Sequence, residues 1–135
     1  MKFMNQNIIG VGWILFDKKT KNVGIHRRDS KAPSDPNMWD HFGGGFEDGV
    51  DKNELDTLKR EISEELGIII DDGKIHELSR GNGSVVYYID FSFDEFCQIK
   101  LGEGAGIAWI TIDGALSLSD MTPKAREVLS LLKEL

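Results

Sequence analysis

The sequence has little that would cross-link it covalently or place it in a membrane. It contains one cysteine, Cys97, which excludes an intramolecular disulfide. Because Cys97 lies in the apolar stretch 93–99, we expect it to be buried as a small hydrophobic residue. No run approaches the roughly 20 apolar residues that a membrane-spanning helix needs, and residues 1–7 lack the features of a signal peptide. We therefore expect a cytoplasmic protein with no membrane partner.

Positive charge is also scarce. The chain has 16 Lys and Arg residues against 23 Asp and Glu, and its formal net charge is -7. Such a protein repels nucleic-acid backbones, so nonspecific nucleic-acid binding is not expected. Phosphates can still bind if the carboxylates first collect divalent cations. The 135 residues, 40% of them hydrophobic, suffice for a single domain over 1–135 with its own core.

Hydrophobic patterning predicts an α+β domain with a mixed sheet and two main helices. Turn residues separate the apolar runs, with a polar turn at 17–22 and a loop at 29–37. The strands are expected at residues 8–16, 23–28, 38–42, 74–80, 84–93 and 107–112. The strand at 38–42 would run directly into three consecutive glycines at positions 43–45.

Both predicted helices have an apolar stripe and recognisable ends. For the helix at 53–66, Asn53 can cap the start and Gly67 stands just past the end. Its stripe consists of Leu55, Leu58, Ile62 and Leu66. Thr122 and Pro123 open the last helix. Its stripe consists of Val128, Leu129, Leu132 and Leu135.

A cluster of glutamates lies on the first helix, opposite the apolar stripe. Glu61, Glu64 and Glu65 fall within about one helical turn of one another. Carboxylates so close repel each other unless a positive group stands between them. Acidic helix faces are commonly just solvated, but this one follows a glycine-rich turn, whose backbone can approach a ligand closely. The pattern favours a site for a hard divalent cation, which prefers oxygen ligands.

The stretch 44–68, GGFEDGVDKNELDTLKREISEELGI, resembles the Nudix box, whose pattern is G-x5-E-x7-R-E-U-x-E-E-x-G-U with U an aliphatic residue. The second half of the pattern matches in full, at Arg60, Glu61, Ile62, Glu64, Glu65, Gly67 and Ile68. One position departs from it: the glutamate expected after Gly44 falls on Val50, and the helix begins two residues late. In the family that glutamate supports the arginine of the box. Either Asp51 or Glu54 is a candidate to support Arg60 in its place.

The resemblance implies a Nudix-type α/β/α sandwich of the MutT-like branch, with a mixed sheet between helices. It also implies hydrolysis of a diphosphate linkage in a nucleotide-like small molecule, with Mg²⁺ or Mn²⁺ as cofactor. The implied metal ligands are Glu61, Glu64 and Glu65, with Glu61 or Glu64 a candidate catalytic base. The Gly43 or Gly44 carbonyl would add a ligand, Glu103 in LGEGAGIAW a further acid, and Arg60 would orient the carboxylates.

The substrate is predicted only in outline. Arg27, Arg28 and Trp39 are candidate substrate-binding residues, the arginines for phosphates and the tryptophan for stacking. Strand alternation places Tyr87 and Phe91 on one face and Tyr88 on the other. The start of the last helix, PKAREVL, lacks the asparagine that reads oxidised guanine in MutT-like enzymes.

Two other functions stay open beside the hydrolase: an idle Nudix domain that senses a nucleotide, and an acidic domain with no site. A monomer and a homodimer are equally compatible with the sequence.

Overall fold

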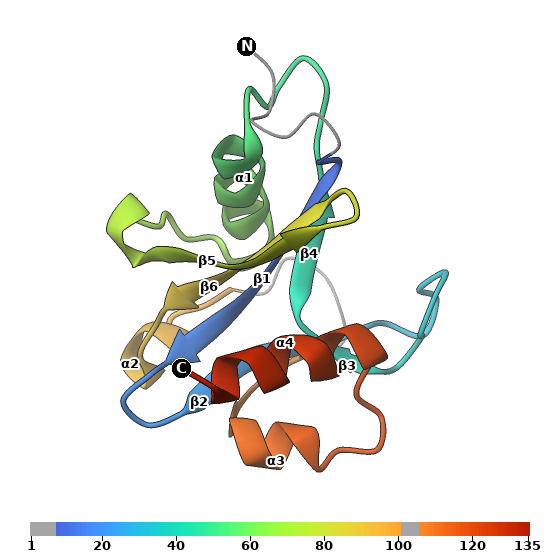
Figure 1. Cartoon of the computed structure of the whole chain (residues 1–135), viewed down its shortest axis with the longest axis vertical. Coiled ribbons are helices and arrows are strands. Elements are labelled where there is room, and N and C mark those ends of the chain that lie inside the picture. The colour runs from blue at the N-terminus through green and yellow to red at the C-terminus, as the bar shows by residue number, and fades with distance from the viewer. Residues whose placement is uncertain (1–7, 101–105) are drawn as a thin grey trace.

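A computed structural model describes residues 8–100 and 106–135 of the chain. Within these residues a single mixed sheet holds seven strands (Figure 1). They are β1 (Gly10–Asp17), β2 (Asn22–Arg27), β3 (Trp39–Asp40), β4 (Phe42–Gly45), β5 (Ile75–Gly81), β6 (Ser84–Asp90) and β7 (Gly106–Thr111).

Strand β1 is the centre of this sheet. It pairs in parallel with β6 along one edge. Along the other edge, its first half pairs antiparallel with β4 and its last residues pair antiparallel with β2. Strand β2 then pairs with β3 and β7, and the His26 ring near its end stacks on Phe42 at the start of β4.

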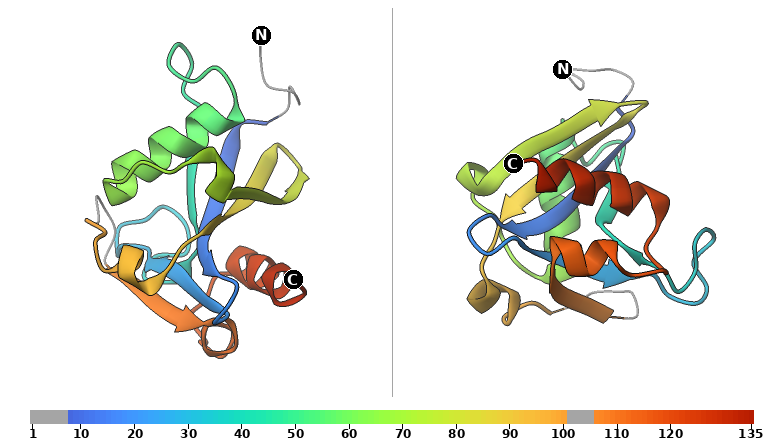
Figure 2. Two further views of the ribbon diagram at one scale, coloured as in Figure 1. Left: turned by 90° about the vertical axis from the view of Figure 1, so that its left-hand side faces the viewer. Right: turned by 60° about the horizontal axis from the view of Figure 1, so that its bottom comes forward.

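Helices cover both faces of the sheet. Helix α1 (Glu54–Leu66) lies on one face, whereas α3 (Ile112–Leu116) and α4 (Pro123–Lys133) lie on the other (Figure 2). Two short elements complete the described chain: the 3-10 turn η1 (Asp72–Lys74) between α1 and β5, and helix α2 (Phe93–Phe96) between β6 and β7. The predicted α/β/α sandwich with a mixed sheet is confirmed. In the described part of the chain no helix has the length and apolar character to cross a bilayer.

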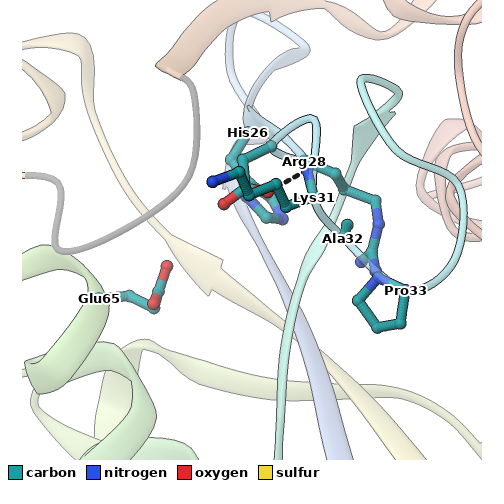
Figure 3. A pocket seen from close by; sticks show the side chains of 7 residues that line it. His26, Arg28, Lys31, Ala32, Pro33 and Glu65 are labelled. Carbon is teal, nitrogen blue, oxygen red and sulfur yellow. Dashed lines mark hydrogen bonds between the residues drawn. The ribbon is translucent and has the colours of Figure 1, made fainter.

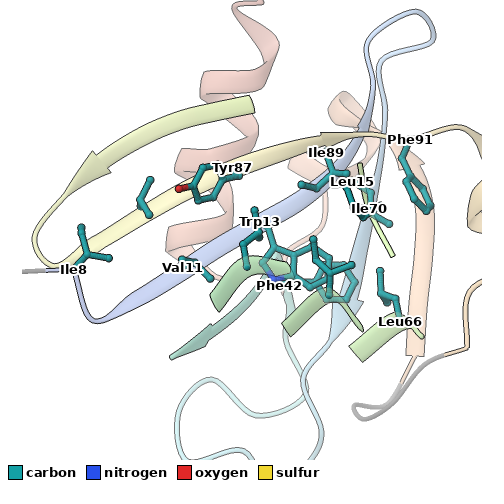
Figure 4. Packing of buried hydrophobic residues seen from close by; sticks show 13 residues of the cluster. Ile8, Val11, Trp13, Leu15, Phe42, Leu66, Ile70, Tyr87, Ile89 and Phe91 are labelled. Atoms are coloured by element: carbon teal, nitrogen blue, oxygen red, sulfur yellow. The ribbon is translucent and has the colours of Figure 1, made fainter. Parts of the chain in front are cut away.

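Alternation along β1 divides the core into two layers. Val11, Trp13 and Leu15 pack with the apolar stripe of α1, while Ile14 and Phe16 pack toward α3 and α4. Figure 4 shows the first layer, with Trp13 and Phe42 side by side near α1. Tyr87 and Phe91 belong to this first layer and Tyr88 packs on the second, as the alternation predicted.

Helix α1 begins and ends as its sequence predicts. The Asn53 side chain accepts a hydrogen bond from the backbone N–H of Asp56, and Gly67 adopts the left-handed conformation with φ of 67°. Leu58, Ile62 and Leu66 are fully buried. The prediction was wrong for Leu55, which is 38% exposed, because the buried stripe begins one turn later.

Other predictions need correction at element ends. Residues 38–42 form two strands rather than one: β3 pairs with β2, and β4 crosses to β1. The strand at 84–93 ends at Asp90, because Ser92 starts α2 with a capping box. Cys97, at the end of α2, is exposed rather than buried. Sequence reasoning missed helix α3, and Leu135 lies beyond α4 and is 44% exposed.

Candidate active site

The loop before α1 is organised around Asp51, whose side chain is only 2% exposed. One carboxylate oxygen accepts hydrogen bonds from the backbone N–H of Glu47, at 2.9 Å, and from the Thr57 hydroxyl, at 3.0 Å. Gly49 turns the same loop with φ of 81°, a conformation that favours glycine. The loop therefore holds a buried carboxylate against the first turns of α1.

Arg60 is the partner of this carboxylate. Its Nε and Nη2 atoms donate to the two oxygens of Asp51 at 2.9 and 2.8 Å, a bidentate pair. These hydrogen bonds lower the pKa of Asp51 from 3.8 to about 2 and raise that of Arg60. Of the two supports left open by the sequence, the structure therefore brings Asp51 to Arg60.

Glu54, the other candidate, takes a different partner. Both of its oxygens accept hydrogen bonds from Arg80 on β5, each at 2.7 Å, and the Tyr87 hydroxyl lies 3.4 Å away. Glu54 is 6% exposed and the Arg80 side chain is 29% exposed, so this ion pair is partly buried. It fastens the first turn of α1 to β5 and β6.

Arg60 also reaches the predicted metal ligands. Its Nη1 atom lies 3.2 Å from Glu61 Oε2 and 3.2 Å from Glu64 Oε1, while Nη2 donates to the carbonyl of Gly45 at 2.8 Å. Two carboxylates thus converge on one positive group beside strand β4. This contact relieves the repulsion that the sequence predicted for the glutamate cluster.

The glycine of the box has a steric role at this point. A Cβ atom on Gly44 would overlap the carboxylate of Glu61. The Glu61 side chain is only 16% exposed, whereas that of Glu64 is 58% exposed. The missing side chain at Gly44 is therefore what allows Glu61 to lie directly against β4.

The donor set suits a hard cation. Mg²⁺ typically takes one or two carboxylates and leaves other positions to water and phosphate oxygens. Glu61 and Glu64 bring two carboxylates together at the Arg60 Nη1 atom. Within residues 8–100 and 106–135 no group of three acidic, imidazole or thiol side chains is arranged as a metal site. The residues present therefore fit a cation held by two carboxylates and substrate oxygens.

A pocket lies between the end of α1 and the end of β2. It has a volume of about 320 Å³, and Figure 3 shows Glu65 on one side with His26, Arg28 and Lys31 on the other. A second pocket, of about 260 Å³, shares His26, Arg28 and Glu65 and extends toward Gly43. Glu65 is thus at the pocket wall, and the acidic helix faces a group of basic side chains.

Arg28 is held in this wall by a chain of hydrogen bonds. Its Nη1 atom donates to Asp40 at 3.3 Å and its Nε to the carbonyl of Ser34 at 2.9 Å. Asp40 in turn accepts from the hydroxyl of Thr122, the N-cap residue of α4, at 2.8 Å. Sequence reasoning missed Asp40. Its position next to Trp39, before the glycines, was the only signal for it.

Two predicted substrate residues lie elsewhere. Arg27 donates to the carbonyl of Asn37 at 3.0 Å and stacks over the ring of Trp39, with 5.8 Å to the ring centroid. Trp39 packs on the second core layer. Neither residue lines the two pockets around His26. Glu103 lies outside the described residues.

One known domain family and several solved structures are similar to this chain. The NUDIX domain model matches residues 6–132. No curated protein is significantly similar to the chain. Several solved structures share its fold.

One is the NUDIX domain of Shewanella oneidensis NrtR complexed with ADP ribose, with 17% identity, a TM-score of 0.72, and coverage of 94% of this chain and 86% of that one. Another is a MutT protein from Methanosarcina mazei Go1, with 19% identity, a TM-score of 0.68, and coverage of 98% and 94%. A third is NrtR from Shewanella oneidensis complexed with a 27mer DNA, with 17% identity, a TM-score of 0.71, and coverage of 93% and 60%.

At these identities the solved structures establish the fold, and the domain match over nearly the whole length establishes the family. The chain belongs to the Nudix family.

Proposed function

We propose that this protein is a Mg²⁺-dependent Nudix hydrolase that cleaves a diphosphate linkage in a nucleoside diphosphate derivative, either a nucleoside triphosphate or a nucleotide joined to another group. Mn²⁺ would serve the same oxygen ligands. The observation that carries the proposal is the convergence of Glu61 and Glu64 on Arg60, beside β4 and next to a pocket with basic side chains.

The proposal gives each acidic residue a role that its position supports. Glu61 and Glu64 would hold the cation, and Glu65 would add a carboxylate from the pocket wall. When bound, Mg²⁺ neutralises phosphate charge and lowers the pKa of a water molecule. One of these two ligands, Glu61 or Glu64, would also act as the base and accept the proton of that water. Glu103 and the Gly44 carbonyl are proposed as further ligands.

The basic residues would hold the substrate. Arg60, fixed by Asp51, keeps the glutamate side chains in place. Arg28 and Lys31 face the acidic helix across the pocket and would bind the outer phosphates. Arg27 and Trp39 stack on each other and line neither pocket, so this proposal gives them no contact with the phosphates.

A second candidate function is nucleotide sensing without turnover. It is favoured by the likeness to the NrtR domain solved with ADP ribose. The two functions differ in whether a bound ligand is cleaved. Retention of both glutamates on Arg60 favours the hydrolase, because a sensor does not require metal-binding carboxylates.

The decisive experiment is an activity panel. Nucleoside triphosphates, nucleotide sugars and dinucleotide polyphosphates are assayed with and without Mg²⁺, and product masses in H₂¹⁸O identify the attacked phosphorus. Glu64→Gln should lower turnover roughly 100-fold or more. Glu127→Gln, an exposed glutamate on α4, is the matched control and should keep full activity. Binding of a ligand by the wild type without product in any Mg²⁺ reaction would replace the hydrolase with the sensor.

A further inference from the structure

His26 is the outermost of three stacked rings. Trp13 and Phe42 stack with 4.3 Å between centroids and 10° between planes. Phe42 and His26 stack with 4.7 Å and 14°. The first two rings are buried, at 0% and 1% exposure, whereas His26 is partly exposed. The aromatic stack therefore begins in the core layer under α1 and ends at the partly exposed ring of His26.

This surface ring lies between the two halves of the candidate site. His26, Arg28 and Glu65 line both pockets, so the imidazole stands beside the basic wall and faces the end of the acidic helix (Figure 3). Phe42 covers one face of the imidazole, and the ring lines both pockets. The two pockets together reach the size range of small-ligand sites.

The imidazole is held as a neutral ring. Its Nε2 atom donates to the carbonyl of His41 at 3.2 Å, because a carbonyl can only accept. Its Nδ1 atom is buried and has no hydrogen-bond partner among the described residues, so a proton there would be unsatisfied. Burial accordingly lowers the pKa of His26. A neutral, oriented ring offers a flat apolar surface.

We infer that His26 is a specificity-determining residue: the face of its ring turned away from Phe42 stacks on the nucleobase of the substrate. The inference rests on the proposed function, since it assigns a base to the diphosphate compound bound at the same site. Base stacking tolerates every base, because each has a π-face, so His26 would select for nucleotides over base-free phosphates rather than for one base. The phosphates of the same molecule would then lie toward Arg28 and the glutamates.

Two substitutions of His26 distinguish the contribution of the ring from that of its hydrogen bond. His26→Gln removes the ring but keeps a donor for the His41 carbonyl. His26→Phe keeps a ring on Phe42 but loses the donor. Thermal unfolding of both variants shows whether each is folded, and either variant alone still reports on the ring if the other fails to fold.

The test is calorimetric titration with AMP, GMP, CMP and UMP, with ribose 5-phosphate as the base-free match. These ligands have no diphosphate linkage, so binding is measured without turnover. We expect His26→Gln to weaken binding of the preferred nucleotide by about 5- to 150-fold, from the strength of base–aromatic stacking. We expect His26→Phe to stay close to the wild type, and ribose 5-phosphate to bind all three proteins alike.

Three results would overturn the inference. They are unchanged nucleotide affinity in His26→Gln, an equal loss for ribose 5-phosphate, and wild-type protein that binds nucleotides no better than ribose 5-phosphate. Loss in His26→Phe with retention in His26→Gln would assign the effect to the hydrogen bond and also reject stacking. The outcome is separable from the proposed function, because stacking can hold in a protein that hydrolyses nothing, and hydrolysis can occur with no contribution from His26.

Discussion

Replacing Asp51 with asparagine tests whether its carboxylate is the anchor of Arg60. Asparagine has the same shape and keeps an acceptor oxygen for Thr57 and the Glu47 N–H, but it removes the charge and one acceptor of the bidentate pair. The fall in the Asp51 pKa from 3.8 to about 2 corresponds to about 2 kcal/mol of folded-state stabilisation at neutral pH. We therefore expect Asp51→Asn to lower the free energy of unfolding by about 2 kcal/mol.

The lowered pKa of Asp51 also fixes how the difference in stability between the two proteins changes with pH. A carboxyl group whose pKa is lower in the folded state stabilises the protein above its unfolded pKa. That stabilisation is lost as the pH falls through the folded value. The difference in the free energy of unfolding between the wild type and Asp51→Asn should therefore be largest above pH 4. It should shrink as the pH falls from about 4 to about 2.

Urea unfolding at pH 7 and at steps below pH 4 measures this difference. Asp48→Asn is the matched control, because Asp48 lies in the same loop and is exposed. Two results would refute the role given to Asp51. One is a loss of unfolding free energy at pH 7 no larger than that of Asp48→Asn, and the other is a loss that stays constant down to pH 2. Such a result would mean that Arg60 is held well enough by Glu61, Glu64 and the Gly45 carbonyl.

The same substitution should act on metal binding. Without the Asp51 carboxylate, Arg60 keeps its contacts to Glu61, Glu64 and the Gly45 carbonyl and a longer ion pair with Glu47 at 3.7 Å, so it would compete more strongly with a cation for the glutamates. Loss of an outer partner of metal ligands typically costs 10- to 100-fold in affinity. The Mg²⁺ concentration for half-maximal activity should rise by roughly that factor, and calorimetric titration with Mg²⁺ checks the change without an activity assay.

Two further substitutions test the steric and electrostatic parts of the site. Gly44→Ala should abolish most activity, because the new Cβ would displace the Glu61 carboxylate, whereas Gly73→Ala, with open space around it, should be neutral in the same assay. Arg28→Met should raise KM with little change in kcat, because it removes phosphate binding from the pocket wall, and initial-rate kinetics against Arg27→Met show whether the effect belongs to the pocket.

Helix α1 was predicted well because the features that define it lie close together in the sequence. They are the spacing of its apolar residues, the Asn53 cap and the terminal Gly67. Strand ends and short helices were predicted less well. The run at 107–112 reads as one strand, but Thr111 caps α3, and Ile112 turns into the core as the first residue of that helix. An apolar residue is equally suited to either element, so only packing decides between them.

The candidate site shows the same division. The glutamates and Arg60 are adjacent in sequence, so their proximity on α1 could be predicted. Arg28 was a candidate from the sequence, but its position opposite the glutamates could not be predicted. Arg28 donates to Asp40, and Asp40 accepts from Thr122, which lies 82 positions beyond Asp40 in the chain. His26 likewise owes its place to Phe42, with which it shares no sequence pattern. Contacts between segments far apart in the sequence create the pocket, and the spacing of residues along the chain does not predict such contacts.

The departure from the Nudix box shows what that pattern constrains. The position where the resemblance expects a glutamate holds Val50, which is 54% exposed. The next residue provides the carboxylate, because Gly49 turns the loop and the Glu47 N–H holds Asp51 inward. A longer loop has thus delivered a shorter acidic side chain to Arg60. The requirement lies in the position of a carboxylate relative to the guanidinium, so spacing along the chain can vary wherever a loop restores that position.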